Sequence, residues 1–235
     1  MSTLWNQIIS AYPPEKRSSD TLWAKIIIRQ LSFYVAWLAM KLGLSAFQVS
    51  MLSLLMPVIA LGFWFTNSPL IAIILLNLWF LLDCVDGNIA RARGGTQMGE
   101  FVDASSGYVM VGLSYLGLGI YLDLSHAVWM GIVAPGFTII GALTSILSLL
   151  ARLYYQKYQN VKNAHEAEIS HQIINESSWI KVIDHNVSIG GFFTPSLLLA
   201  YFINQLPLLL VLYAAYNSVY FLGSAAILLW RSRNR

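Results

Sequence analysis

The sequence predicts an all-α membrane protein with six transmembrane helices, preceded by an N-terminal amphipathic helix that lies at the membrane interface. Hydrophobic residues make up 57% of the 235 residues and charged residues only 11%, whereas a soluble domain carries about 25% charged residues. Six separate apolar stretches are typical of helices that cross a bilayer. When these stretches are threaded back and forth, the basic residues all fall on one side.

The N-terminal part divides into two segments. Residues 1–20 are polar and contain Pro13-Pro14, so we expect a loose cytoplasmic lead, and residues 1–9 lack the pattern of a cleaved signal peptide. Residues 21–43 are apolar with a polar stripe spaced three or four residues apart, which predicts one helical face. We expect this helix to lie in the interface, with its cations reaching the lipid headgroups. The stripe consists of Thr21, Lys25, Arg29 and Ser32.

We expect residues 21–235 to form a single membrane domain. It contains the interfacial helix, six spans and a cytoplasmic connection at 152–190. The alternative, a seventh span at 21–43, is less favourable because this segment holds three cations. Three prolines fall inside the spans, and the fifth span is the shortest. The predicted spans run at about 46–65, 70–90, 98–122, 127–151, 191–204 and 207–230.

The distribution of basic residues sets the orientation. With six spans, each of the 14 lysines and arginines falls on the side of the two termini or at its membrane edge. The positive-inside rule therefore places both termini at the cytoplasmic face. Five spans would break this segregation. We expect an integral protein of a bacterial or archaeal cytoplasmic membrane.

Three carboxylates stand at the facing ends of the second and third spans. At about 100° per residue, Asp83 and Asp86 share one helical face with Gly87 and Ala90, and Gly99 and Asp103 line one face of the next helix. The short connection, which contains Gly94-Gly95, would bring the two faces together as an antiparallel pair. Charge inside a membrane segment costs roughly 2.5–3.5 kcal/mol per residue, so it is usually functional.

This set of side chains favours a divalent metal site. Mg²⁺ and Mn²⁺ prefer oxygen ligands, and Mg²⁺ commonly binds one or two carboxylates together with substrate phosphates. Gly87 and Gly99 leave room for a bulky ligand. Arg91 supplies a fixed cation for a phosphate group. We therefore expect Mg²⁺ or Mn²⁺ and a phosphate-bearing ligand.

The same residues resemble the signature of the CDP-alcohol phosphotransferase (CDP-alcohol phosphatidyltransferase) family. The family's pattern has eight fixed positions, and seven of them match. The matching part, Asp-x2-Asp-Gly-x2-Ala-Arg followed by Gly-x3-Asp, runs from Asp83 to Asp103, and the eighth position is 107. Residues 42–50 are similar to the family's entry to its first span, although Ala46 replaces a proline. The family transfers a phospho-alcohol group from a CDP-alcohol to a second alcohol and releases CMP. Its members have six helices, usually form dimers, and use divalent metal.

The resemblance implies roles for individual residues. Asp83, Asp86 and Asp103 would bind metal, with Asp103 also catalytic, and the donor would contact Gly87, Ala90, Arg91 and Gly99. The implied partners are a CDP-alcohol donor, an alcohol or polyol-phosphate acceptor, membrane lipids and a second copy of the chain, with phospholipid biosynthesis as the setting. We expect no nucleic-acid partner.

Position 107 departs from this signature. Glycine stands where the family's fourth aspartate would bind a second metal and accept the acceptor's proton. Glu100, one turn before Asp103, is a candidate substitute base, and an acceptor that carries its own base is another solution. Arg152 is a candidate for binding the acceptor, with membrane anchoring as the alternative. Two further hypotheses remain: a silent relative that binds CDP-alcohol or metal without turnover, and a small cation transporter.

Overall fold

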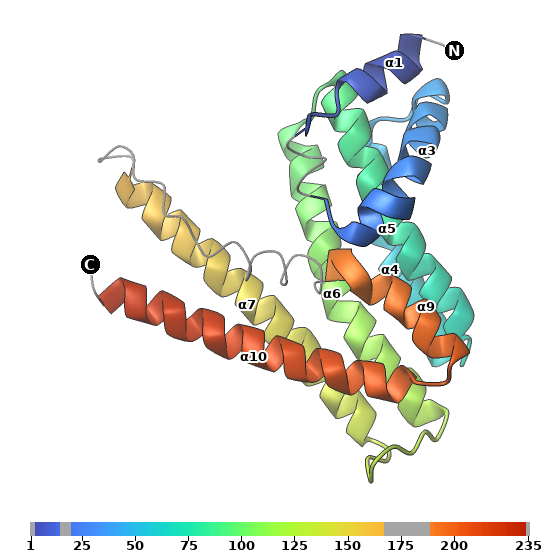
Figure 1. Ribbon diagram of the computed structural model, residues 1–235, viewed down its shortest axis with the longest axis vertical. Coiled ribbons are helices and arrows are strands. Elements are labelled where there is room, and N and C mark those ends of the chain that lie inside the picture. Colours follow the sequence, from blue (N-terminus) through green and yellow to red (C-terminus); the bar gives the residue numbers. More distant parts are fainter. Residues whose placement is uncertain (1–2, 15–19, 167–188, 234–235) are drawn as a thin grey trace.

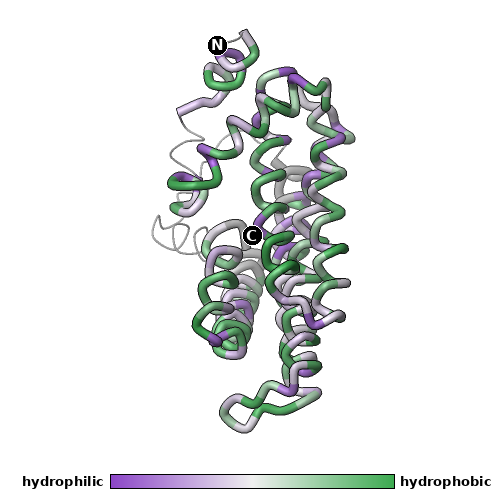
Figure 2. Tube along the Cα trace, turned by 90° about the vertical axis from the view of Figure 1, so that its right-hand side faces the viewer, coloured by the Kyte–Doolittle hydropathy of each residue, from purple (hydrophilic) through white to green (hydrophobic). Residues whose placement is uncertain are grey.

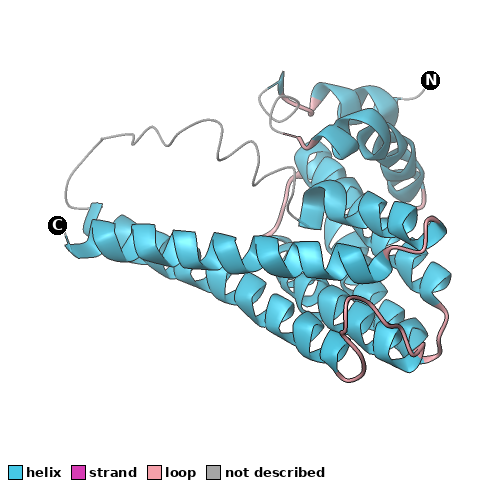
Figure 3. Ribbon diagram, turned by 60° about the horizontal axis from the view of Figure 1, so that its bottom comes forward, coloured by secondary structure: helices cyan, strands magenta, loops and turns pink. Residues whose placement is uncertain are grey.

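The computed structural model describes residues 3–14, 20–166 and 189–233, and each named element within these ranges is a helix (Figure 1). Five of these helices are long and apolar enough to cross a membrane. The five are α4 (Ala46–Phe65), α5 (Pro69–Arg93), α6 (Gln97–Leu124), α7 (Gly136–Glu166) and α10 (Leu206–Arg233). Figure 2 shows that apolar residues dominate the long helices, and Figure 3 shows the loops that join α4, α5, α6 and α7 in sequence order.

The long helices form two groups. Helix α4 packs along both α5 and α6, whereas α5 and α6 touch each other only slightly. Helix α7 packs on α6, and α10 runs beside α7 as the pair leaves the first three helices (Figure 1). Fully buried side chains such as Trp64, Tyr115 and Phe137 fill the core between them. The sequence predicts that α5 and α6 pack directly on each other as an antiparallel pair. In the structure α4 lies between them and contacts both.

The fifth predicted span, at 191–204, is not confirmed, so that five spans are found in the described residues where six were predicted. The chain at this place contains η2 (Ile189–Phe193), a π-helical turn with a kink at Gly191, followed by α9 (Thr194–Phe202). The apolar helical stretch Gly191–Phe202 has 12 residues, which is about 18 Å at 1.5 Å per residue, against a hydrocarbon core of about 30 Å. It packs against α5, where the Asn77 side chain donates a hydrogen bond of 3.1 Å to the Thr194 carbonyl oxygen. Most of the predicted connection at 152–190 lies outside the described residues.

Helix α7 begins later than the sequence predicts. The span expected from residue 127 starts at Gly136 instead, because residues 125–135 form a turn with a bridge between Trp129 and Ile132. The Asp123 carboxylate accepts hydrogen bonds from the backbone N–H groups of Phe137 and Thr138, at 3.3 and 2.8 Å. A carboxylate at this position satisfies the free N–H groups and complements the helix dipole. Asp123 thus caps a helix.

Two of the three prolines placed inside predicted spans stand at helix starts instead. Pro57 lies within α4, but Pro135 directly precedes α7 and Pro195 occupies the first turn of α9. A proline is tolerated in the first turn because its missing N–H has no partner there in any case.

The N-terminal residues are more ordered than their polar composition predicts. Residues expected to be a loose lead include α1 (Thr3–Ser10), whose Ile8 is 1% exposed. The Gln7 side chain donates a hydrogen bond of 2.8 Å to the carbonyl oxygen of Ala92 at the end of α5. The following helix consists of η1 (Ala24–Ile28), a π-helical turn, and α3 (Arg29–Lys41). These contacts attach the N-terminal segment to the end of α5.

The prediction that Arg29 reaches the headgroups is wrong. Arg29 is only 6% exposed, and its guanidinium forms a two-bond ion pair with Asp20 at 2.6 and 2.8 Å. Thr21 and Ser32 of the same stripe are buried as well, while Lys25 is exposed. Three of the four stripe residues therefore pack inward, and Arg29 can do so because Asp20, nine residues away, pairs with it. The location of this helix in the membrane interface stays a prediction.

Close packing of α6 and α7 depends on glycine. A Cβ atom added at Gly141 would lie 3.1 Å from the carbonyl carbon of Tyr115 and 3.4 Å from the Cα of Gly119, both backbone atoms. We expect Gly141→Ala to lower the free energy of unfolding by about 1–3 kcal/mol or more, because backbone atoms cannot move aside. Gly223→Ala is the matched control, since no atom lies within 4 Å of its Cβ. Thermal unfolding in detergent measures both, and equal midpoints would contradict the prediction.

Candidate metal and phosphate site

A pocket of about 430 Å³ lies where α4, α5 and α6 meet at one end of the bundle. We call it the carboxylate pocket. It brings together six of the nine residues singled out from the sequence, drawn from two different helices. Its lining consists of Ala46, Ser50, Asp86, Gly87, Ala90, Gly95, Thr96, Gln97, Gly99, Glu100 and Asp103.

The last turns of α5 supply one wall. Asp86, Gly87 and Ala90 are spaced so that they share one helical face, and all three line the pocket. Helix α5 ends at Gly94, whose φ of +93° is strained for any residue with a side chain. This glycine turns the chain directly toward α6, and so the two ends of the connection face the same pocket.

The first turns of α6 supply the second wall. Thr96 caps the helix, since its hydroxyl accepts a hydrogen bond of 3.0 Å from the backbone N–H of Gly99. This cap fixes the start of the helix, so that Gly99, Glu100 and Asp103 face the pocket. Glu100 and Asp103 are both exposed. Glu100, the candidate base, and Asp103, the candidate catalytic aspartate, therefore share one cavity.

Helix α4 supplies a third wall, which the sequence analysis missed. The helix begins with a capping box in which Ser45 and Gln48 exchange hydrogen bonds of 3.2 and 2.9 Å. One turn later, the Ser50 hydroxyl donates a bond of 2.5 Å to the Asp86 carboxylate. Serine is common in membrane helices. The only sequence signal was therefore the resemblance of residues 42–50 to the family's entry motif.

The carboxylates are unequally placed. Asp86 is 2% exposed and lies close enough to Asp103 for their charges to interact. Asp83 is half-buried and is not part of the pocket lining. Within the described residues, no three His, Cys, Asp or Glu side chains form a group that could hold a metal ion. Two carboxylates still fit a cation such as Mg²⁺, which commonly completes its shell with water and substrate phosphates.

Gly107 faces open space. A Cβ atom added there has no heavy atom within 4 Å, although the residue is half-buried. The neighbouring serines form hydrogen bonds with other residues. The Ser105 hydroxyl donates to the carbonyl oxygen of Phe101 at 2.7 Å, and the buried Ser106 hydroxyl is hydrogen-bonded to Ser53 and Trp79. No atom of the Ser105 side chain lies within 4 Å of the Cβ position of an acidic side chain at 107.

Arg91 lies beside the carboxylate pocket. Its guanidinium nitrogens are 3.3 Å from the place where a Cβ of Gly87 would stand, and one of them donates a bond of 2.8 Å to the Asn88 side chain. Gly87 therefore leaves room for the Arg91 guanidinium as well as for a ligand. The Nε atom of Arg91 is buried and has no hydrogen-bond partner among the described residues.

Arg152 is separate from the pocket. It lies on α7 and does not contribute to the lining. One turn further along α7, Gln156 donates a hydrogen bond to the Tyr108 hydroxyl on α6. Because residues 152 and 156 share a helical face, this face of α7 lies beside the part of α6 that follows Gly107.

The comparison with known proteins covers these helices. A family model described as CDP-alcohol phosphatidyltransferase matches residues 44–230. The matched range includes every residue that lines the carboxylate pocket. No curated protein matches the chain.

Proposed function

This chain belongs to the CDP-alcohol phosphatidyltransferase family, and from that premise we propose that it transfers a phospho-alcohol group to an alcohol acceptor at the cytoplasmic membrane face. The family is defined by the use of a CDP-alcohol donor with an alcohol acceptor, and it is generally dependent on a divalent metal. The acceptor that we propose is an alcohol or a polyol phosphate. We also propose that the chain acts as a homodimer with both termini in the cytoplasm.

The main support is the composition of the carboxylate pocket. Asp86 and Asp103 come from different helices yet line one cavity, together with Gly87, Ala90 and Gly99. These are the family's motif residues, and they converge although 17 residues separate the two aspartates along the chain. A volume of about 430 Å³ is within the range of small-molecule sites.

We propose that Asp86 and Asp103 bind Mg²⁺ or Mn²⁺, with Asp83 as a further ligand in the presence of substrate. A bound divalent ion would neutralise the diphosphate and stabilise the charge that develops on departing CMP. Arg91 would bind the diphosphate from the side of Gly87. The acceptor hydroxyl oxygen bonds to the phosphorus that carries the alcohol, the bond from that phosphorus to the CMP oxygen breaks, and Glu100 takes the hydroxyl proton.

Gly107 favours a second candidate function. A general base typically contributes about 10²–10⁴-fold to a rate, and glycine at this position supplies none. A relative that binds CDP-alcohol or metal without turnover is therefore the alternative. Glu100 on the pocket lining supports the active enzyme, because a carboxylate is present close to Asp103. Arg152, on the α7 face beside the segment after Gly107, is the candidate for an acceptor phosphate.

Release of CMP tests the proposal. Full-length protein in detergent, with Mg²⁺ or Mn²⁺, is offered a panel of CDP-alcohols and acceptors, and CMP is measured. We expect metal-dependent CMP release that requires an acceptor. Binding of the nucleotide with no CMP release across the panel would favour the silent relative, and absence of both would contradict the proposal.

Gly87→Ala tests the placement of Arg91. A Cβ atom 3.3 Å from two guanidinium nitrogens is tighter than most real contacts, so the arginine must shift by a few tenths of an ångström. We expect CDP, in the presence of Mg²⁺, to bind about tenfold more weakly, which is about 1.4 kcal/mol. Calorimetric titration measures the affinity. Gly62→Ala on α4, where no atom lies within 4 Å of the added Cβ, is the control. Unchanged affinity in Gly87→Ala would contradict this placement.

A further inference from the structure

One buried amide joins two arginines behind the carboxylate pocket. Asn88 is 2% exposed, and its Oδ1 atom accepts hydrogen bonds from Arg91 at 2.8 Å and from Arg29 at 3.2 Å. Its Nδ2 atom donates a bond of 2.9 Å to the Ser32 hydroxyl. Asn88 thus links α5 to α3 and holds two like charges at one acceptor.

The two arginines differ in how their charge is balanced. Arg29 forms its two-bond ion pair with Asp20, which also accepts a hydrogen bond from the Tyr12 hydroxyl. Burial raises the pKa of Tyr12 to about 12, and the hydrogen bond to Asp20 adds to this shift, so the phenol stays protonated as a donor. Among the ion pairs found in the described residues none is formed by Arg91, whose charge interacts with the carboxylates of Asp20 and Asp86 only at longer range. The cluster of Tyr12, Asp20, Arg29, Asn88 and Arg91 therefore carries one positive charge in excess.

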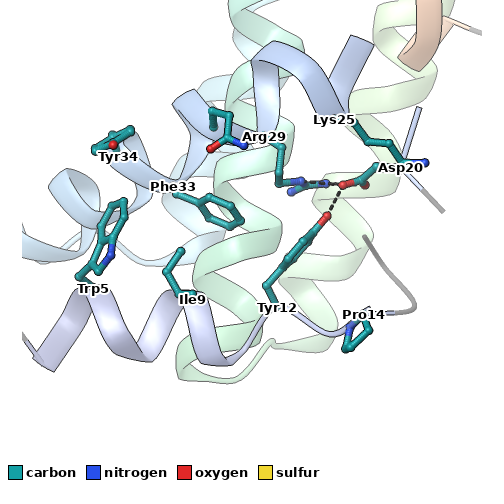
Figure 4. A pocket seen from close by; sticks show the side chains of 10 residues that line it. Trp5, Ile9, Tyr12, Pro14, Asp20, Lys25, Arg29, Phe33 and Tyr34 are labelled. Atoms are coloured by element: carbon teal, nitrogen blue, oxygen red, sulfur yellow. Dashed lines mark hydrogen bonds and ion pairs between the residues drawn. The ribbon is translucent and has the colours of Figure 1, made fainter. Parts of the chain in front are cut away.

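The excess charge lies between two cavities. On one side Arg91 packs against Gly87 of the carboxylate pocket. On the other side, its guanidinium carbon lies 5.7 Å from the centre of the Tyr12 ring, while that of Arg29 lies 4.9 Å from the same ring. Tyr12, Asp20 and Arg29 line a separate pocket of about 470 Å³ under α1 (Figure 4). The N-terminal segment is therefore the wall behind Arg91.

We infer that Asn88 is a positioning residue, which fixes Arg91 at the edge of the carboxylate pocket so that its guanidinium, which forms no close ion pair, meets the diphosphate of a bound nucleotide. This inference rests on the proposed function. The Arg29–Asp20 ion pair is the anchor to which Asn88 ties Arg91. Tyr12, Asp20 and Arg29 all precede residue 44, where the match to the family model begins. Tyr12, Asp20 and Arg29 thus support the nucleotide site although they lie outside the matched range.

A neutral acceptor at position 88 is essential to this role. An alanine would release the Arg91 guanidinium while Arg29 stays paired with Asp20, and repulsion between the two cations would move Arg91 away from the pocket edge. An aspartate has the same shape and accepts the same two bonds more strongly, but it neutralises Arg91. Asn88→Ala therefore tests the hydrogen bonds that Asn88 accepts. Asn88→Asp tests whether Arg91 must keep its positive charge.

The test is calorimetric titration of CDP, with Mg²⁺, into full-length protein in detergent, together with the thermal unfolding midpoint. We expect Asn88→Ala to weaken CDP binding at least about tenfold and to lower the midpoint. We expect Asn88→Asp to weaken CDP binding by a similar factor or more, with a midpoint that is unchanged or higher. Gln7→Ala is the control, because it removes a tether between α1 and Ala92 without touching either arginine, and it should bind CDP like the wild type.

The outcomes are distinguishable. Asn88→Asp that binds CDP as tightly as the wild type, or that fails to fold, would overturn the positioning role. Gln7→Ala that weakens CDP binding as much as Asn88→Ala would also overturn it, because any loosening of the N-terminal segment would then have the same effect. Wild-type protein that binds no CDP in the presence of Mg²⁺ would instead overturn the proposed function itself.

Discussion

Replacing Asp86 by asparagine should lower CMP release by about 10²–10³-fold, the size expected when one preorganised electrostatic contact is lost. Asparagine has the same shape and can still accept the 2.5 Å hydrogen bond from Ser50. It cannot carry the negative charge that a divalent ion requires. The rate of CMP release under saturating Mg²⁺ and donor measures the effect, and the thermal midpoint confirms that the variant is folded.

Asp123→Asn is the matched control for Asp86→Asn. It makes the same chemical change, but Asp123 caps α7 through two backbone N–H groups far from the carboxylate pocket. We expect it to lower stability by about 0.3–1 kcal/mol, because asparagine keeps one acceptor oxygen but loses the second one and the charge that complements the helix dipole, and to leave the rate per folded molecule unchanged. A wild-type rate in Asp86→Asn, or equal losses of rate in both variants, would contradict the assignment of Asp86.

Replacing Gly107 by aspartate should raise CMP release by about 10²-fold or more, the lower end of what a general base contributes. The space is available, because no heavy atom lies within 4 Å of the added Cβ. Residue 107 also follows Asp103 by one helical turn, so the two carboxylates would share a face. The rate of CMP release measures the gain, and binding of CDP should change far less than the rate.

Glu100 decides how this gain is interpreted. If Glu100 is the base in the natural chain, Glu100→Gln should slow CMP release in the wild type but have little effect in Gly107→Asp. A double-mutant cycle over the two positions gives this coupling directly. Gly107→Asp without any gain, combined with Glu100→Gln without any loss, would contradict a carboxylate base at either position.

The sequence predicts the carboxylate pocket well because helical periodicity is a local property. The predicted faces are Asp83, Asp86, Gly87 and Ala90 on one helix and Gly99 and Asp103 on the next, and the structure brings all of these except Asp83 to one cavity. Helical spacing alone did not reveal that α4 lies between α5 and α6. The third wall and the bond from Ser50 to Asp86 therefore escaped prediction.

Other differences come from pairings between residues far apart in the sequence or from local capping. Arg29 looked like a snorkelling cation because its stripe is polar, but Asp20 pairs with it and Asn88 binds it from α5. The apolar composition of residues 127–135 predicts helix. In the structure α7 begins only at Gly136, and the Asp123 side chain caps its first turn. Apolar composition alone does not tell a turn from the start of a span.

Binding of Mn²⁺ tests the central claim most directly, because that claim is that carboxylates from α5 and α6 hold a divalent ion beside the nucleotide. Electron paramagnetic resonance can count the Mn²⁺ bound to the full-length protein with and without CDP. We expect the wild type to bind Mn²⁺, CDP to tighten that binding, and Asp86→Asn and Asp103→Asn each to abolish it. Mn²⁺ binding that both variants retain, or that CDP leaves unchanged, would contradict the claim.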